Sequence, residues 1–273
     1  MKTTVVLNRK TGGRFSAWQV LRPVRLPSGH RIAQALSIPL FLGFWQWISG
    51  SGMVNALLFP PPTEVALALY TWAAEGTLWQ DLGMSVSRVV MGFLSGAATG
   101  VFAGILTGRF PIADGFLTPI FSLLRPIPPI AFVPIVILWF GLSEWGKYFL
   151  VFWGIFFTLW LATHLGVRRV DKTLIRAAQS LGTPEHKMLR HVLLPGALPY
   201  IFVGLRTSVS ISFYTLVAAE LAGAFYGVAY RIDISHQNLQ IGQMLAGLVV
   251  LGLMSATADL IFRLVSRRIA WWE

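Results

Sequence analysis

The chain has 273 residues, of which 55% are hydrophobic and only 12% are charged, and its mean hydropathy is +0.65. A water-soluble domain of this length would not remain in solution with that composition, so the sequence predicts an integral membrane protein. The absence of cysteine excludes disulfides, thiol catalysis and cysteine-based metal sites. The net charge of +11 would suggest a nucleic-acid partner for a soluble protein, but in a membrane protein it reports which loops face the cytoplasm.

Six apolar segments are predicted to cross the membrane as helices, because a bilayer core of about 30 Å requires roughly 20 apolar helical residues. Charged residues set most of the boundaries: 20 uncharged residues separate Arg88 from Arg109, and another 20 separate Lys147 from Arg168. The predicted spans are residues 32–49, 89–108, 116–143, 148–167, 195–219 and 241–265. The expected fold class is therefore all-α, a polytopic membrane helical bundle.

The distribution of Lys and Arg predicts the orientation. Residues 1–31 carry seven basic and no acidic side chains, and the loop at residues 168–194 carries six basic ones, whereas the loops on the other side hold only Lys147 and Arg231. The positive-inside rule then places both termini in the cytoplasm. A signal peptide is the alternative for the basic start, but that start is too long and lacks a small-residue cleavage site. We expect a basic cytoplasmic segment at 1–31 and a single transmembrane domain at 32–273.

The loop at residues 168–194 contains a polar, helix-prone stretch, "RAAQSLGTPEHKMLRHVLLP", at residues 176–195. At 100° per residue one arc is apolar and the opposite arc is polar or basic, so the pattern predicts an amphipathic helix. Thr183 is the expected N-cap, with Pro184 at the first helical position. A helix lying on the membrane surface is the simplest interpretation. The apolar arc comprises Met188, Leu189, Val192 and Leu193, and the polar arc His186, Lys187, Arg190 and His191.

Three features of the spans bear on transport. Glycines at every fourth position, from Gly92 to Gly108, predict close helix packing, with sliding between transport states as the alternative. Prolines in the third span, among them Pro128 and Pro129, exclude a straight helix and favour a span that borders the pathway. In the fifth span, Ser208, Ser212 and Thr215 predict either hydrogen bonds between helices or a polar lining of the pathway.

Two charged residues in the fifth span also have predicted roles. Glu220 lies at its predicted outer boundary, where it could line the pathway, pair across subunits, contact a partner protein or be hydrated. Arg206 is expected to be an inner-side charge that positions the base of the span, in preference to the alternative of a substrate ligand. Within the sixth span, Arg263 is one helical turn after Asp259 and is expected to pair with it.

No enzyme active site is predicted. The five histidines show no metal-ligand spacing, and the sequence contains no GxxxxGK[ST] phosphate-binding loop. We therefore expect no catalytic residue and no metal site, and the chain does not hydrolyse ATP itself. Energy for any active transport must come from a partner.

The spacing within the polar loop resembles the EAA loop of bacterial ATP-binding-cassette (ABC) importer permeases. Ala177-Ala178 is followed by Gly182 and then by Val192-Leu193-Leu194-Pro195, although Arg176 stands where the family pattern has glutamate. Residues 58–65, 124–150 and 194–224 are similar to permeases of the nitrate, sulfonate and taurine group. The resemblance extends from about residue 40 to the C-terminus.

This resemblance implies a type I ABC importer (MetI-like) permease in a bacterial cytoplasmic (inner) membrane, surrounded by lipid and with no nucleic-acid partner. Two permease copies would bind a cytoplasmic ABC ATPase dimer and receive substrate from an external or periplasmic solute-binding protein. ATP and Mg would be bound by the ATPase, and this chain would hold no cofactor. The residues implied for ATPase coupling are Ala177, Ala178, Gly182, Glu185, His186, Lys187, Arg190 and Pro195.

The expected substrate is a small anion, with taurine or another alkanesulfonate favoured by the segments 175–182 and 215–221. Nitrate, aromatic carboxylates and vitamin precursors remain alternatives, because importers of this kind take specificity mainly from the binding protein. Two other classes stay open: an ion-coupled secondary transporter, which would require paired acids within the spans and an internal repeat, and a structural or signalling membrane protein that uses the loop for docking.

Overall fold

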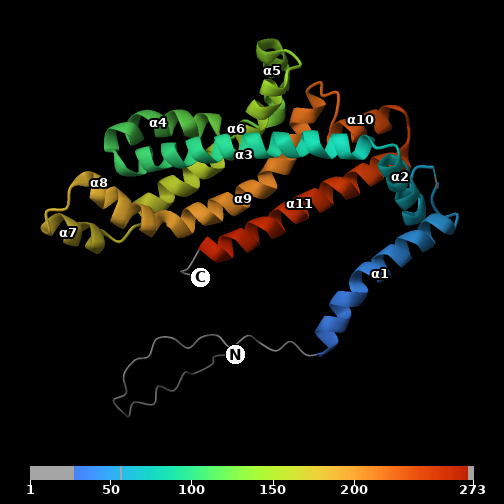
Figure 1. Ribbon diagram of the computed structural model, residues 1–273, viewed down its shortest axis with the longest axis horizontal. Helices are drawn as coiled ribbons and strands as arrows, with labels where there is room; N and C mark the ends of the chain where they lie inside the picture. The colour runs from blue at the N-terminus through green and yellow to red at the C-terminus, as the bar shows by residue number, and fades with distance from the viewer. Residues whose placement is uncertain (1–27, 56, 270–273) are drawn as a thin grey trace, which may run out of the picture.

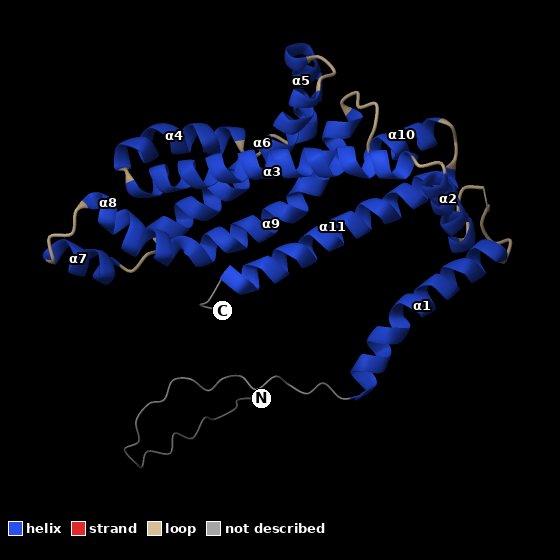
Figure 2. Cartoon of the chain, in the orientation of Figure 1, coloured by secondary structure: helices blue, strands red, loops and turns tan. Residues whose placement is uncertain are grey.

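The chain folds as an elongated bundle of helices, seen in a computed structural model that describes residues 28–55 and 57–269 (Figure 1). Within these residues the secondary structure consists of helices joined by loops and turns, without strands (Figure 2). The predicted all-α class is thus confirmed. The predicted basic segment at 1–31 falls mostly outside the described residues.

Five helices are long and apolar enough to cross a membrane. They are α1 (Ser28–Gly50), α3 (Thr77–Arg109), α6 (Glu144–Arg168), α9 (Leu194–Leu221) and α11 (Ile241–Ile269). A sixth span is formed if α4 (Pro111–Leu124) and α5 (Val133–Phe140), which are bent by 86° at a short break, are counted together. The predicted count of six is met in this sense, with the third span broken as its prolines require.

The remaining helices are short and lie at the two ends of the bundle. α2 (Pro62–Ala74) and α10 (Val228–Gln237) lie at one end, and α7 (Lys172–Ser180) and α8 (Glu185–Met188) at the other (Figure 1). By the predicted orientation, α2 and α10 mark the outer end and α7 and α8 the cytoplasmic end. Neither α2 nor α10 was predicted, although Pro62 at the first turn and Glu64 after it are favourable for a helix start.

The boundary predicted at Arg88 is wrong. α3 begins at Thr77, so Arg88 lies inside a helix of 33 residues, which is about 50 Å long. The Arg88 side chain is fully buried. A charge normally ends an apolar span, but here the guanidinium is neutralised by carboxylates from other helices, and the helix continues through it.

The glycine face of α3 packs against α6, which confirms the packing interpretation of the repeat. A Cβ atom at Gly104 would lie 2.5 Å from Thr163 Cβ and 2.7 Å from the Trp160 carbonyl oxygen, a separation that only glycine permits. Contacts advance by four residues on both helices at once, so α3 and α6 run parallel. The successive pairs are Gly92 with Val151, Gly96 with Ile155, Gly100 with Leu159, Gly104 with Thr163, and Gly108 with Val167.

The break between α4 and α5 is enclosed by protein at its inner face. The indole Nε1 of Trp153 donates to the Ile127 carbonyl, at 3.4 Å, which partly satisfies a backbone group in the proline-rich break. The Pro129 ring lies within 3.5 Å of the position that a Cβ atom at Gly154 would occupy. Beyond the break, α5 rises from the side of the bundle (Figure 1) and packs against the start of α6, where Val136 lies 2.7 Å from the position of a Cβ atom at Gly146. The broken segment is therefore anchored on α6.

Candidate coupling loop, buried ion cluster and pathway residues

The turn between α7 and α8 is built around Gly182. Its φ of +68° lies in the left-handed region, which favours glycine. The Gly182 N–H donates to the Gln179 carbonyl, and the Thr183 N–H donates to the Ala178 carbonyl. These two bonds form a Schellman motif, which ends α7 and fixes the direction of the chain that follows. The glycine of the loop motif is thus required by backbone geometry.

The helix predicted to start at Thr183 is arranged differently. Pro184, in extended conformation, is the N-cap residue of α8, and Thr183 makes no side-chain capping bond. The capping side chain of the loop is Asp171, which accepts from the Thr173 N–H at 2.8 Å at the start of α7. That backbone hydrogen bond lowers the pKa of the Asp171 carboxyl. The predicted N-cap, Thr183, thus lies one residue before the N-cap of α8.

α8 does not end before the fifth span. It continues through a π-helical turn, η2 (Leu189–Leu193), directly into α9, giving a helical run from Glu185 to Leu221. Pro195 lies in the first turn of α9, where its missing N–H is accommodated beside the widened turn. Pro195 therefore does not mark a joint between two separate helices.

The apolar arc predicted for this helix is buried in protein and not on lipid. Met188 and Leu193 form a cluster with Val170 and Ala178, and Leu189 and Val192 pack against it. α7 and α8 thus form a small hydrophobic unit of their own at the cytoplasmic end. The interpretation of a helix resting on the membrane surface is not supported by this arrangement.

Most residues assigned to ATPase coupling are exposed. Ala178 alone among them is buried, since it belongs to the cluster beneath α7. Glu185 Oε1 accepts a hydrogen bond from Nη2 of Arg109, at the end of α3, at 2.6 Å. This contact ties α8 to α3. The exposed members are Ala177, Gly182, Glu185, His186, Lys187, Arg190 and Pro195, and Arg176 is exposed beside them.

The polar stripe predicted in the fifth span is turned into the bundle. Ser208, Ser212 and Thr215 are all buried. Ser212 Oγ donates to the Val209 carbonyl at 2.6 Å, and Thr215 Oγ1 to the Ser212 carbonyl at 3.0 Å, so these two hydroxyls bond to their own helix and not to another. The predicted hydrogen bonds between helices are therefore not formed by these hydroxyls, and the pathway role remains a prediction. Pro128 is exposed and Pro129 is half-buried.

The Ser208 hydroxyl is buried without a hydrogen-bond partner in the described part of the chain. Replacing it with alanine removes an unsatisfied polar group, so Ser208→Ala is expected to raise the free energy of unfolding, by up to about 1 kcal/mol. Unfolding of the purified protein in detergent would measure this change. A loss of transport without loss of stability would instead show that the hydroxyl meets the transported solute.

An ion cluster at the outer end of the bundle was missed by sequence reasoning. Arg88 binds Glu144 through two parallel hydrogen bonds, Nε to Oε2 at 2.7 Å and Nη2 to Oε1 at 2.8 Å. Its Nη1 donates to Glu220 Oε1 at 3.0 Å and to the Tyr226 carbonyl at 2.7 Å. Lys147 completes the cluster, 3.2 Å from Glu144. Helices α3, α6 and α9 are thereby joined at one guanidinium.

Glu220 is fully enclosed within the chain, which corrects the expectation that it is hydrated or pairs outside it. Besides Arg88, it accepts from Ser85 Oγ at 2.6 Å and from the Ala229 N–H at 2.7 Å, at the start of α10. A carboxylate in this place satisfies unpaired N–H groups of the helix and complements its dipole. A Cβ atom at Gly227 would collide with the carboxylate, so only glycine fits there.

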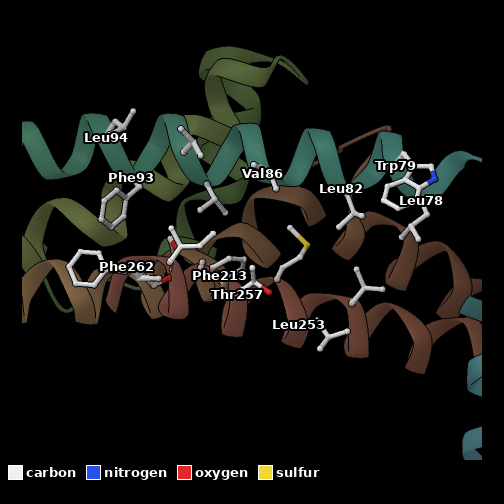
Figure 3. Close-up of a pocket in the computed structure, with 18 of the residues that line it drawn as sticks. Leu78, Trp79, Leu82, Val86, Phe93, Leu94, Phe213, Leu253, Thr257 and Phe262 are labelled. Atoms are coloured by element: carbon white, nitrogen blue, oxygen red, sulfur yellow. Dashed lines mark hydrogen bonds between the residues drawn. The ribbon is translucent and has the colours of Figure 1, made fainter. Parts of the chain in front are cut away.

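An apolar groove lies between α3, α9 and α11 (Figure 3). Its volume is about 860 Å³, and nearly every residue that lines it is aliphatic or aromatic. Phe93 and Leu82 come from α3, Phe213 from α9 and Leu253 from α11 (Figure 3). Polar groups are few in this lining, with Trp79, Ser212 and Thr257 as the exceptions, so size alone does not make the groove a site for an anion.

A bundle of five or six helices long and apolar enough to cross a membrane, with a structured loop at one end, defines a multi-pass membrane protein. Residues 96–271 match the family model of the binding-protein-dependent transport system inner membrane component. The chain belongs to this family, as its resemblance to ABC importer permeases predicted.

Similar proteins extend the match over the full chain. The taurine transport system permease protein TauC of Escherichia coli (strain K12) is 33% identical, covering 99% of this chain and 98% of the relative. The putative aliphatic sulfonates transport permease protein SsuC of Bacillus subtilis (strain 168) is 35% identical, covering 86% and 85%. The MetNI methionine ABC transporter, solved in inward-facing conformations, shares the fold with a TM-score of 0.54 and 21% identity, covering 73% of this chain and 97% of the solved chain.

Proposed function

We propose that this chain is the permease subunit of an ATP-driven importer for taurine or another alkanesulfonate, in a bacterial cytoplasmic membrane. The observation that carries the proposal is the pair of relatives named for taurine and aliphatic sulfonates, each at least 33% identical over most of this chain. Two copies of the chain form the translocation pathway. An external binding protein delivers the solute, and a cytoplasmic ATPase dimer binds and hydrolyses Mg-ATP.

The loop from α7 to α8 is the proposed contact for the ATPase. Force applied there reaches the spans by two routes: α8 continues without interruption into α9, and Glu185 holds α8 to Arg109 at the end of α3. The Schellman turn at Gly182 keeps α7 at a fixed angle to this lever. Closure of the ATPase dimer then moves α3 and α9 together, and the pathway alternates between inward-open and outward-open states.

Two variants test the coupling role. Gly182→Pro forces φ to about −65° where the turn requires a positive value, and the pair Lys187→Glu with Arg190→Glu reverses the charge of the exposed loop. Both proteins should insert into the membrane, but ATPase co-purification and ATP-driven taurine uptake in proteoliposomes should fall at least ten-fold. The matched control is Arg267→Glu with Arg268→Glu, which reverses two exposed charges near the end of α11, outside the loop.

Uptake at the normal level in both loop variants would contradict the coupling role. The class of transporter is tested in the same vesicles: an importer needs ATP and the ATPase, whereas a secondary transporter would take up taurine on an imposed ion gradient without them. Gradient-driven uptake by the chain alone would therefore reject the importer.

A further inference from the structure

The surface of α9 that the rest of the chain leaves uncovered is polar. Its exposed residues between positions 203 and 214 lie on one side of the helix, at spacings of three or four, and only Val203 among them is apolar. This face is distinct from the buried hydroxyls at 208, 212 and 215. The exposed polar residues are Arg206, Thr207, Ser210 and Tyr214.

This polar face lies deep in the span. Arg206 is 12 residues after the first residue of α9 and 15 before the last, which places it roughly 18 Å from one end and 22 Å from the other. The neighbouring Gly204 packs against Leu159, the same residue that meets Gly100 midway along the bundle. Arg206 therefore lies near the middle of α9 and not in its first turns.

A charged side chain at this depth is not stable against lipid tails, and such residues face protein or water-filled cavities. The Arg206 side chain is 59% exposed in the single chain. The face that carries it must consequently border an aqueous space or a second chain when the protein is in a membrane. A row of hydroxyls beside it is suited to a wet surface and not to a lipid-facing one.

A polar pocket of about 510 Å³ is located on this face, between α9 and α11. Two positive charges and one negative charge lie in or beside this pocket. The acid is Asp259, which pairs with Arg206 at 3.5 Å and with Arg263 at 3.1 Å. One carboxylate cannot use all the donors of two guanidiniums, so N–H groups of Arg206 remain available. In the described residues, Ser210 and Tyr214 make no hydrogen bond through their hydroxyls, and these are also free donors.

We propose that Arg206, with the hydroxyls of Ser210 and Tyr214, forms an intramembrane contact site for the sulfonate group of the transported solute. This inference rests on the proposed importer function and adds a place where the solute is bound in transit. A guanidinium pairs geometrically with the oxygens of a tetrahedral oxyanion, and the hydroxyls donate to the remaining oxygen. Because the site is open and partly neutralised by Asp259, it binds weakly enough to release the anion onward.

The test uses the complete transporter, with its ATPase and binding protein, in proteoliposomes with radiolabelled taurine as the probe. Arg206→Gln should reduce ATP-driven uptake at least ten-fold, while Arg206→Lys should retain a larger part of it. The matched control is Arg263→Gln, which removes the same charge from the other partner of Asp259 but lies outside the pocket, and it should transport normally. Uptake by Arg206→Gln equal to the unaltered protein would overturn the site.

A purely structural ion pair makes a different prediction. If Arg206 served only to hold Asp259, then Asp259→Asn would reduce uptake as strongly as Arg206→Gln does, and this result would overturn the contact site. If Arg206 binds the anion, Asp259→Asn removes a competing carboxylate and uptake is maintained or increased. Failure of Arg206→Gln to assemble with the ATPase or the second copy would assign the residue to a subunit contact and also reject the proposal.

The proposed importer function and the proposed Arg206 contact site are rejected by different results. Absence of ATP-driven taurine uptake by the unaltered complex would reject the proposed sulfonate importer, together with the site that depends on it. Uptake by the unaltered complex combined with normal uptake by Arg206→Gln would reject the site alone.

Discussion

Glu220→Gln is expected to lower the free energy of unfolding by about 3–5 kcal/mol, because it leaves the buried Arg88 guanidinium without one of its two carboxylate partners. Both side chains of this pair are fully shielded from solvent, so water cannot replace the lost charge. The substitution keeps the shape of the side chain but replaces an acceptor oxygen by an NH₂ group, which faces other donors from Ser85 and α10. Equilibrium unfolding in mixed detergent micelles would measure the change.

The control for this substitution is Glu75→Gln, which makes the same chemical change at an exposed position on the same side of the bundle and should alter stability by less than about 0.5 kcal/mol. A double-mutant cycle adds a second measurement. Arg88→Met is destabilising alone, and combined with Glu220→Gln it should cost clearly less than the two single changes together. Additive costs would show that the two groups do not interact in the folded protein.

The ion cluster around Arg88 holds helices together, and this role is separate from the proposed transport pathway. Arg88 joins α3, α6 and α9, while Glu220 also fixes the first turn of α10, so the outer ends of these helices are held as one unit. Motion driven from the cytoplasmic loop would then be transmitted by helices that keep their outer connections. The polar face around Arg206 lies below this cluster, on a side of α9 that the other helices leave uncovered.

The arrangement of spans could be predicted from local sequence because it follows from apolar length and from the positions of unpaired charges. The span boundary predicted at Arg88 is wrong for a physical reason. Its partners are 56 and 132 positions away, and no local spacing shows that a charge will be neutralised. A signal was nevertheless present: Arg88 is followed directly by an apolar span and preceded by helix-compatible sequence, without a proline near it to end a helix.

Some residues of the candidate site could be predicted from the sequence and others could not, for a related reason. Gly182 was predictable, since a helix end in the left-handed region requires glycine whatever the rest of the fold is. The direction of the hydroxyls in α9 was not, because that helix carries polar residues on two faces and a buried Ser or Thr can bond to its own backbone. The packing of α3, α6 and α11 against α9 determines which face is covered.

Gly104→Ala is expected to destabilise the protein by about 1–3 kcal/mol, the usual cost of overpacking a close contact. The added Cβ would lie 2.5 Å from Thr163 Cβ and 2.7 Å from the Trp160 carbonyl oxygen, so the α6 backbone itself must move. Because α3 and α6 run parallel with a four-residue repeat, a shift at this level also loosens the contacts at Gly100 and Gly108. Thermal unfolding of the detergent-solubilised protein, followed by loss of its monodisperse elution, would measure the effect.

The sign of this prediction opposes helix propensity, which favours alanine over glycine by up to about 1 kcal/mol in a helix interior. Gly83→Ala provides the matched control, since Gly83 is in the same helix and a Cβ atom there would meet nothing within 4 Å. Gly83→Ala should therefore be neutral or stabilising while Gly104→Ala is destabilising. Equal effects at both positions would mean that propensity, and not the α3 to α6 contact, determines how this glycine repeat contributes to stability.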